Sequence, residues 1–298
     1  MRQAEEAVKL AGIVTALITP FDGDRVDLDA LAELVTGQIA AGIHGVVACG
    51  TTGEPATMSH EERDAVIRTV VEVVAGRIPV LAGTGTNCTR TTIAETQRAR
   101  DLGVDGALVV TPYYNRPQQE GMIEHYRGVA AEGGLPVVLY NVPSRTGVNL
   151  LPRTVACLAQ IPGIVGVKEA SGSVGPVRDI VASAPAGFQV LSGDDALALP
   201  SFAVGARGVI SVASNVAARP MVEMWDAWKA GRAADAAEVD RSLLDLYNAL
   251  FLEASPAPVK AAAALLGMCR DDVRLPLVKA GRATRDALEA ALATAGLR

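Results

Sequence analysis

A lysine and a tyrosine in this sequence each end a short apolar segment in which a polar side chain is unexpected. Lys168 ends the segment IVGVK, and Tyr140 ends VVLY. Removal from water penalises the charged form of a lysine, and a neutral amine can attack a carbonyl to give a Schiff base. A phenol next to that amine could move protons on and off the carbinolamine oxygen. The two residue types together therefore indicate imine chemistry on a carbonyl compound.

Each of the two residues also has a structural interpretation. A lysine at the end of a strand can reach solvent or pair with a neighbour such as Glu169. A tyrosine after an apolar run is usually a core residue with a hydrogen-bonded hydroxyl. Position alone favours these structural roles, and only the two residues taken together with other polar groups favour catalysis.

Small and hydroxyl-bearing residues elsewhere could hold a carboxylate. The segment GTTGE at 50–54 offers backbone N–H groups and the hydroxyls of Thr51 and Thr52, a combination that suits an anion. No Gly-Lys-Ser/Thr follows, so it is not a P-loop, and it could be only a tight turn. Arg145 could bind a second carboxylate through two parallel hydrogen bonds, or be a solvated loop residue. Thr51 and Tyr114 could form a hydroxyl relay to the phenol.

The sequence offers no recognisable metal site. Its four cysteines form no CxxC pair and its three histidines no HExxH pair. Asp194 and Asp195 are adjacent, and adjacent side chains on an extended backbone point apart, so we expect them to cap a helix rather than to bind a cation. We therefore expect metal-free chemistry on a small acidic substrate, with no cofactor.

Eight short apolar segments bounded by Gly, Pro, Asp or Asn are typical of strands. They are residues 12–20, 45–50, 78–83, 107–112, 135–143, 163–171, 188–195 and 208–215. Segments with helical periodicity lie between them, and the one at 59–76 begins with the capping-box residues Ser59 and Glu62. Its expected buried face consists of Ile67, Val70, Val71 and Val74. This alternation predicts a parallel sheet covered by helices.

Eight strand–helix units favour an α/β fold of the closed (β/α)8 type, the TIM barrel. A doubly wound open sheet is the alternative, but it usually carries a glycine-rich phosphate loop after its first strand, and TPFDGDRVD is no such loop. Functional groups of a (β/α)8 barrel lie at the C-terminal ends of its strands, where Tyr140 and Lys168 would end neighbouring strands. Ala- and Leu-rich helices follow residue 217. We predict a barrel domain at 1–230 and a helical C-terminal extension at 231–298.

Composition excludes several classes of protein. Of the 298 residues, 50% are hydrophobic and 20% charged, which allows a large core. The net charge of −6, with no segment dense in Lys and Arg, argues against binding of nucleic acid. No apolar run approaches the ~18 residues of a membrane span, and no secretory signal is recognisable. We expect a cytoplasmic protein that binds no membrane.

Six motifs, taken together and in order, resemble the dihydrodipicolinate synthase and N-acetylneuraminate lyase family. They are GTTGE, VTPYYNRPQQEG, YNVPSRTG, GVKEASG, LSGDD and GVISVASN. The resemblance runs from VTALITPF to the C-terminal helices. It implies a pyruvate-dependent class I aldolase-type lyase in which Lys168 forms the imine and Tyr140 transfers protons. Thr51 and Tyr114 would complete the relay, Tyr114 from the partner subunit of a homo-oligomer, either a dimer or a dimer of dimers (homotetramer).

The resemblance also implies how the substrates are bound. The pyruvate carboxylate would contact Thr51 and Thr52, the backbone of Gly193 and Ile210 would lie near the imine, and Arg145 would receive the carboxylate of the second substrate. GTTGE and YNVPSRTG resemble the synthase branch, which condenses pyruvate with L-aspartate 4-semialdehyde to 4-hydroxy-tetrahydrodipicolinate for lysine and diaminopimelate biosynthesis. The alternatives are cleavage of a sialic acid or 2-keto-3-deoxy acid with release of pyruvate, and a barrel that binds a keto acid without catalysis.

The chain departs from the family pattern at the pocket where lysine inhibits some of these synthases. The corresponding positions are Pro55, Ala56, His60, Arg63, Asn87, Thr91 and Tyr113. Thr91 stands where an acidic residue would hold the lysine ammonium group, Arg63 replaces a histidine, and Pro55 replaces a serine. Loss of an anion and gain of a cation weaken an ammonium site, so we predict weak or absent inhibition by lysine.

Overall fold

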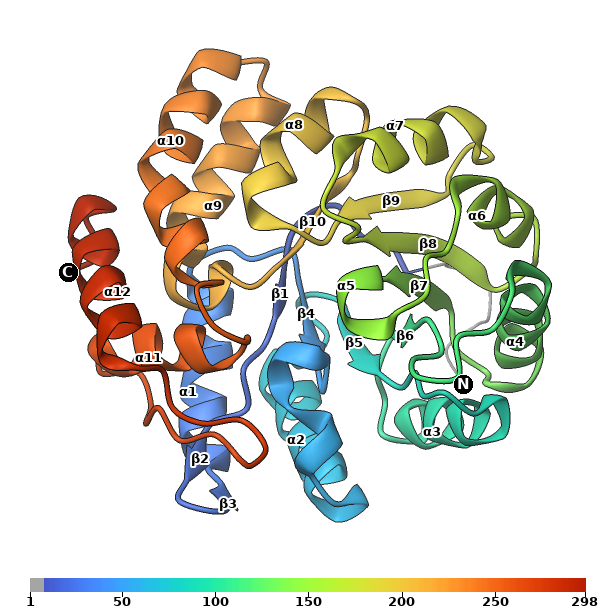
Figure 1. Cartoon of the computed structure of the whole chain (residues 1–298), viewed down its shortest axis with the longest axis horizontal. Coiled ribbons are helices and arrows are strands. Elements are labelled where there is room, and N and C mark those ends of the chain that lie inside the picture. Colours follow the sequence, from blue (N-terminus) through green and yellow to red (C-terminus); the bar gives the residue numbers. More distant parts are fainter. Residues whose placement is uncertain (1–7) are drawn as a thin grey trace. The chain divides into compact units, whose positions relative to one another are not determined.

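The eight predicted strands form one closed parallel barrel in the computed structural model, which describes residues 8–298 (Figure 1). They are β1 (Gly12–Ala16), β4 (Gly45–Ala48), β5 (Val80–Gly83), β6 (Gly106–Val110), β7 (Val137–Asn141), β8 (Ile164–Glu169), β9 (Gln189–Ser192) and β10 (Gly208–Ser211). Their order in the sheet is β1-β10-β9-β8-β7-β6-β5-β4, so barrel strands that follow each other in the sequence are neighbours. The predicted (β/α)8 fold is confirmed, and the open doubly wound sheet is wrong.

The barrel strands are apolar because both of their faces exclude water. Every residue of β1, β4, β7, β9 and β10 is buried. Side chains fill the interior of a (β/α)8 barrel and helices cover its outside. A polar side chain on such a strand therefore needs a specific reason to be there.

The described chain is organised in two compact units, and the first consists of residues 8–11 and 79–210. It contains β5 to β9 and most of β10. Its helices are α3 (Thr89–Asp101), α4 (Gln119–Glu132), α5 (Pro143–Thr146), α6 (Pro152–Leu158), α7 (Val174–Ser183), the short 3-10 helix η3 (Asp195–Leu197) and α8 (Ala198–Ala203). In the parallel pairing of β7 with β8, Leu139 lies opposite Val167 and Tyr140 opposite Lys168.

The second unit consists of residues 12–78 and 211–298. Besides β1 and β4 it contains α1 (Leu28–Ala40), the 3-10 helices η1 (Thr51–Gly53) and η2 (Pro55–Thr57), α2 (His60–Val74), α9 (Ser214–Lys229), α10 (Ala233–Ala249), α11 (Ala257–Leu265) and α12 (Arg282–Thr294). The predicted capping box is confirmed, because Ser59 accepts from the Glu62 N–H and Glu62 accepts from the Ser59 N–H. Val66 is buried on α2 in place of the predicted Val71, which is half-buried.

A small antiparallel hairpin of the second unit was not expected from the sequence. β2 (Phe21–Asp22) pairs with β3 (Arg25–Val26). Gly23 begins the two-residue turn with a φ of 61°, a conformation that glycine adopts without the strain of a Cβ. Two-residue strands are too short for an alternating apolar pattern, and this is why the sequence did not predict them.

The predicted boundary near residue 230 coincides with the end of α9. Ala230 follows the last residue of α9, and α10 begins at Ala233. The division into a barrel domain at 1–230 and a helical extension at 231–298 stays a prediction. Residues 231–298 are called the C-terminal extension below. Among the helices of residues 8–298, none has the length and apolar character needed to cross a membrane.

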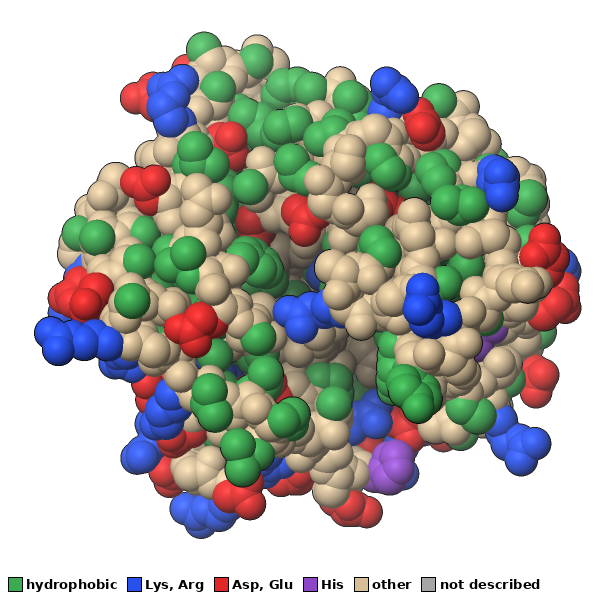
Figure 2. Space-filling view, viewed as in Figure 1, with side chains coloured by type: hydrophobic (Ala, Val, Ile, Leu, Met, Phe, Trp, Pro, Cys, Tyr) green, Lys and Arg blue, Asp and Glu red, His purple; other side chains and the backbone are tan. Residues whose placement is uncertain are grey.

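Charged side chains are mixed on the molecular face shown in Figure 2. Lysines and arginines lie among aspartates and glutamates there, and do not gather into one basic region. Such a mixed face offers no strong positive field for a nucleic-acid backbone.

Candidate active site

The structure brings Lys168 and Tyr140 together inside the first unit. They occupy opposite positions on the paired strands β8 and β7. The Nζ atom of Lys168 lies 4.5 Å from the centre of the Tyr140 ring. Both side chains are buried, with exposed fractions of 4% for Lys168 and 7% for Tyr140. An amine and a phenol thus share one poorly hydrated site at the C-terminal ends of two strands.

Gly193 provides the space that the Lys168 side chain occupies. A Cβ atom at position 193 would lie 3.0 Å from Cε of Lys168 and 2.5 Å from Cβ of Ala170. The N–H of Gly193 donates to the carbonyl of Glu169 at 2.7 Å, which ties the end of β9 to the end of β8. A side chain at this position would therefore displace the lysine stem.

Glu169 is not the partner of Lys168. Its carboxylate accepts hydrogen bonds from the side-chain amide of Asn141, at 3.3 and 3.0 Å, and from the backbone N–H of Ser171 at 2.9 Å. Burial raises the pKa of Glu169 above its ordinary value, and the hydrogen bonds from Ser171 and Asn141 oppose that shift. Within residues 8–298, Lys168 forms no ion pair. The predicted structural alternative of a Lys168–Glu169 pair is wrong, because neighbouring side chains of a strand point to opposite faces.

The charge of Lys168 acts on the carboxyl group of Asp194. Burial raises the pKa of the Asp194 carboxyl, while the charge of Lys168 and a hydrogen bond from the Gly172 N–H lower it. Asp194 occupies the N-cap position of η3, as predicted, but its side chain makes no capping hydrogen bond. The short helix therefore does not hold this carboxylate.

Ile210 lies on β10, next to β9, which Gly193 directly follows. The pairing of β10 with β9 places Val209 opposite Ser192. Ile210 is fully buried. The backbone at positions 193 and 210 therefore belongs to neighbouring strand ends of the same unit.

Tyr114 and Arg145 lie together on the exposed side of the first unit. The N–H of Tyr114 donates to the carbonyl of Thr146 in α5, the short helix that also carries Arg145, at 3.4 Å. Tyr114 has a φ of 73° and an exposed fraction of 88%. Its phenol is thus in solvent within its own chain, whereas Lys168 and Tyr140 are buried.

Thr51 and Thr52 belong to the second unit. They form the 3-10 helix η1 with Gly53, and the Gly53 N–H donates to the carbonyl of Gly50 at 2.8 Å. Thr52 is buried and Thr51 half-buried. The hydroxyl of Thr19 holds this turn by donating to the carbonyl of Gly53 at 2.7 Å. The predicted tight turn is present as this short 3-10 helix.

Sequence reasoning missed a second buried lysine, Lys260, which pairs with Glu54 at the end of the same turn. The signal was a single charged residue inside the apolar run APVKAAAALL. A lysine in such a run requires a partner that the local sequence does not supply. Among residues 8–298, no group of three or more His, Cys, Asp or Glu side chains is placed to hold a metal ion.

Comparison with known proteins assigns this arrangement to a family. Residues 9–295 match the dihydrodipicolinate synthetase family. The chain is 51% identical over 281 residues to a 4-hydroxy-tetrahydrodipicolinate synthase of Magnetococcus marinus, covering 94% of this chain and 96% of that protein.

Solved structures give the same result for the fold. The dihydrodipicolinate synthase of Thermotoga maritima is 40% identical, with a TM-score of 0.96 over 98% of this chain and 100% of that one. The chloride-inhibited dihydrodipicolinate synthase of Acinetobacter baumannii, solved in complex with pyruvate, is 42% identical with a TM-score of 0.95 over 97% of this chain and 100% of that one.

Proposed function

Because the chain belongs to the dihydrodipicolinate synthetase family, we propose that it condenses pyruvate with L-aspartate 4-semialdehyde to give 4-hydroxy-tetrahydrodipicolinate. This is a carbon–oxygen lyase activity of lysine and diaminopimelate biosynthesis. Relatives at about half sequence identity over nearly the whole chain carry the name of this synthase. These relatives favour the synthase activity over cleavage of a sugar acid and over binding of a keto acid without catalysis.

The contact between Lys168 and Tyr140 is the observation that supports the chemistry. The neutral amine of Lys168 attacks the C2 carbonyl of pyruvate, the carbinolamine oxygen leaves as water, and a C=N bond remains. Loss of a C3 proton then gives an enamine, whose C3 attacks the aldehyde carbon of the second substrate. The amino group of that substrate then replaces the Lys168 amine at C2, which closes the ring and releases the lysine. Each step moves a proton, and the phenol of Tyr140 is the buried acid–base group next to Nζ.

The remaining site residues have proposed roles in binding. Thr51 and Thr52 hold the pyruvate carboxylate, and Thr51 also passes protons to Tyr140. The backbone groups of Gly193 and Ile210 line the imine. Arg145 binds the carboxylate of the aldehyde substrate.

The exposure of Tyr114 bears on the oligomeric state of the protein. Its phenol is 88% exposed in its own chain, so a role in the proton relay requires a second subunit that covers it. We propose a homo-oligomer, a dimer or a dimer of dimers, in which Tyr114 completes the partner's site. A cytoplasmic location fits a biosynthetic activity on these metabolites.

Trapping of the imine tests the proposed function. Borohydride reduction with pyruvate should add to Lys168 the mass of pyruvate minus water plus two hydrogens, located by peptide mass mapping. A parallel assay should compare aspartate semialdehyde with several sugar aldehydes as acceptors. No adduct on Lys168 would favour a keto-acid binder, and turnover only with a sugar aldehyde would exclude the synthase activity.

Weak or absent feedback by lysine is a further expectation for this enzyme. Thr91 stands where an acidic residue would hold the lysine ammonium group in inhibited relatives, Arg63 replaces a histidine, and Pro55 replaces a serine. Initial rates measured with added lysine should stay near the uninhibited value. Inhibition at sub-millimolar lysine would contradict this prediction.

A further inference from the structure

The C-terminal extension places a buried ammonium group against the carboxylate that follows the Thr51–Thr52 turn. Lys260, on α11, is fully buried, and its Nζ lies 2.5 Å from Oε1 of Glu54. Nζ also donates to the backbone carbonyl of Asp272 at 2.8 Å and lies 3.9 Å from the centre of the Phe21 ring. The ion pair, the carbonyl and the ring together define the position of Nζ.

Glu54 has a backbone conformation that needs external support. It caps η1 in the left-handed region, with a φ of 56° and a ψ of 41°, and its N–H donates to the carbonyl of Thr51 at 3.2 Å. Residues other than glycine occupy this region only where the surrounding structure holds them. The position of the Glu54 carboxylate is thus coupled to the turn that carries Thr51 and Thr52.

Arg274, also in the extension, binds the other carboxylate oxygen of Glu54. Its backbone N–H donates to Oε2 of Glu54 at 3.2 Å. Its guanidinium donates to the carbonyl of Thr57 at 2.9 Å and to Glu62 at 2.6 and 2.8 Å, and its Cζ lies 4.5 Å from the centre of the Phe21 ring. Both carboxylate oxygens of Glu54 are therefore bound by the extension.

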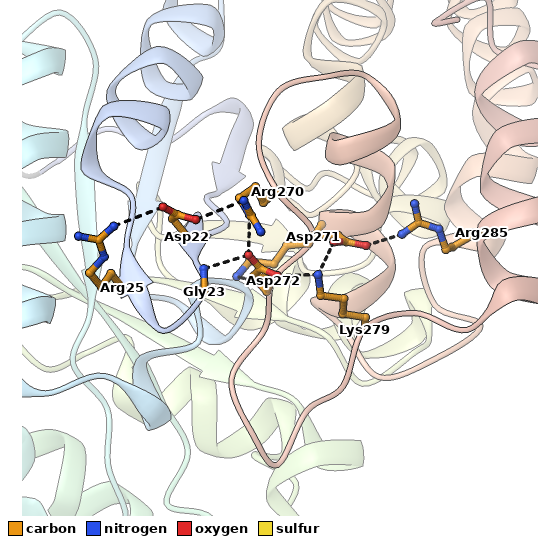
Figure 3. Close-up of polar contacts among 9 residues, drawn as sticks. Asp22, Gly23, Arg25, Arg270, Asp271, Asp272, Lys279 and Arg285 are labelled. Carbon is orange, nitrogen blue, oxygen red and sulfur yellow. Dashed lines mark hydrogen bonds and ion pairs between the residues drawn. The ribbon is translucent and has the colours of Figure 1, made fainter.

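The loop that carries Arg274 is itself anchored to the hairpin β2–β3 (Figure 3). Asp272 accepts from the Gly23 N–H at 3.0 Å, and Arg270 pairs with Asp22 at 3.3 Å. Lys279 joins Asp271 and Asp272 at 2.8 and 2.5 Å. These contacts fix the loop after α11 to the hairpin β2–β3.

We propose that Lys260 is a positioning residue for the reaction, because it holds Glu54 and through Glu54 orients the hydroxyl and N–H groups of the Thr51–Thr52 turn. The catalytic part of this inference rests on the proposed function. Apolar side chains of similar volume often stabilise a protein as well as a buried ion pair does. A charged pair with fixed partners, in contrast, imposes a defined geometry on the turn.

Two variants and one control test the inference. Lys260→Met removes the ammonium group, and the double variant Lys260→Met/Glu54→Gln removes both charges while keeping an acceptor for the Arg274 N–H, in case the single variant does not fold. Lys229→Met is the matched control, because Lys229 also lies near an aromatic ring, 5.7 Å from that of Trp225, but is exposed.

Hydrogen exchange measured without substrate reports on the turn directly. We expect amide exchange over residues 50–57 to accelerate about tenfold in the folded variants and to stay unchanged in Lys229→Met. We also expect kcat/KM for pyruvate to fall at least about tenfold, mainly through KM. Borohydride trapping at saturating pyruvate should still label Lys168, since the amine and the phenol are in place.

Hydrogen exchange and kinetics test the positioning role of Lys260, and imine trapping tests the proposed function. Wild-type exchange and wild-type KM in a folded double variant would overturn the positioning role. If the unmodified protein gave no imine with pyruvate, the proposed function would fail. Exchange over 50–57 would still decide whether Lys260 orders the turn.

Discussion

Two lysines of this protein are buried beside an aromatic ring, one in each compact unit, and they differ in whether a carboxylate pairs with them. Lys168 lies 4.5 Å from the ring centre of Tyr140, and Lys260 lies 3.9 Å from that of Phe21. Lys260 pairs with Glu54 at 2.5 Å, whereas Lys168 has no ion-pair partner within residues 8–298. Burial and a nearby ring are therefore not enough to indicate the role of a lysine.

A carboxylate partner keeps a buried amine protonated and therefore favours a structural role over the nucleophilic role proposed for Lys168. Burial lowers the pKa of the Lys260 ammonium below its ordinary value, and the Glu54 carboxylate counteracts that shift. An amine held by a carboxylate has its lone pair occupied by a proton, so it cannot attack a carbonyl. Lys168 has the ring of Tyr140 at its side instead of a carboxylate in ion-pair contact.

The largest effect is expected from Lys168→Met. Without the amine no imine forms, so kcat should fall by about 10⁴-fold or more. The thermal midpoint should decrease only slightly, because methionine fills a similar volume and Asp194 loses the attraction of a charge with which it forms no ion pair. Steady-state kinetics and calorimetry measure the two quantities. A large loss of stability would mean that Lys168 is structural, as Lys260 is.

Lys260→Met should give the opposite pattern in stability. Loss of one partner of a buried ion pair leaves an uncompensated charge and costs about 3–5 kcal/mol of unfolding free energy. The double variant Lys260→Met/Glu54→Gln should lose less, because no buried charge is left over. Denaturant unfolding of both variants checks this. Equally small losses in the two would show that the pair contributes no more than a surface ion pair.

Tyr140→Phe tests which part of the tyrosine matters. The ring beside Lys168 is kept and only the hydroxyl is lost, so we expect folding to be unchanged and kcat to fall about 10²- to 10³-fold. Pyruvate should still form the imine at equilibrium, but more slowly, which rapid-quench borohydride trapping can follow. An unchanged kcat would exclude the phenol from proton transfer.

The smallest effect concerns the charged anchor of the extension. Hydrogen bonds from Lys279, Gly23 and Arg270 lower the pKa of Asp272 to about 2. The unfolded chain thus binds a proton that the folded chain does not, so the stabilisation is complete above the ordinary pKa of 3.8 and is lost as the pH falls toward 2. Solvent screening limits it to about 1 kcal/mol. In the Asp272→Asn variant, the thermal midpoint should depend less on pH between pH 2 and 3.8. If the variant showed the same pH dependence as the unmodified protein, other carboxylates would be its cause.

The strands and the lysine–tyrosine contact could be predicted because they depend on local patterns. Buried parallel strands need continuous apolar residues, so all eight were recognisable. The polar residues at the end of each apolar segment were then the candidates for the site. The hairpin β2–β3 escaped prediction because its strands are too short to show a pattern. The side chain of Asp194 does not cap its helix, and the charge of Lys168 acts on it instead, an interaction between strand ends that the local sequence does not specify.

The sequence by itself determined the fold class and the residue types available for imine chemistry, since both follow from local hydrophobic patterning and from side-chain chemistry. Only the tertiary structure decided the partner of each buried lysine. Glu54 and Lys260 lie far apart in the chain, as do Glu54 and Arg274, and nothing in either local segment specifies the other. Electrostatic environment is a property of groups brought together by folding, so two similar lysines acquire different surroundings only once the chain has folded.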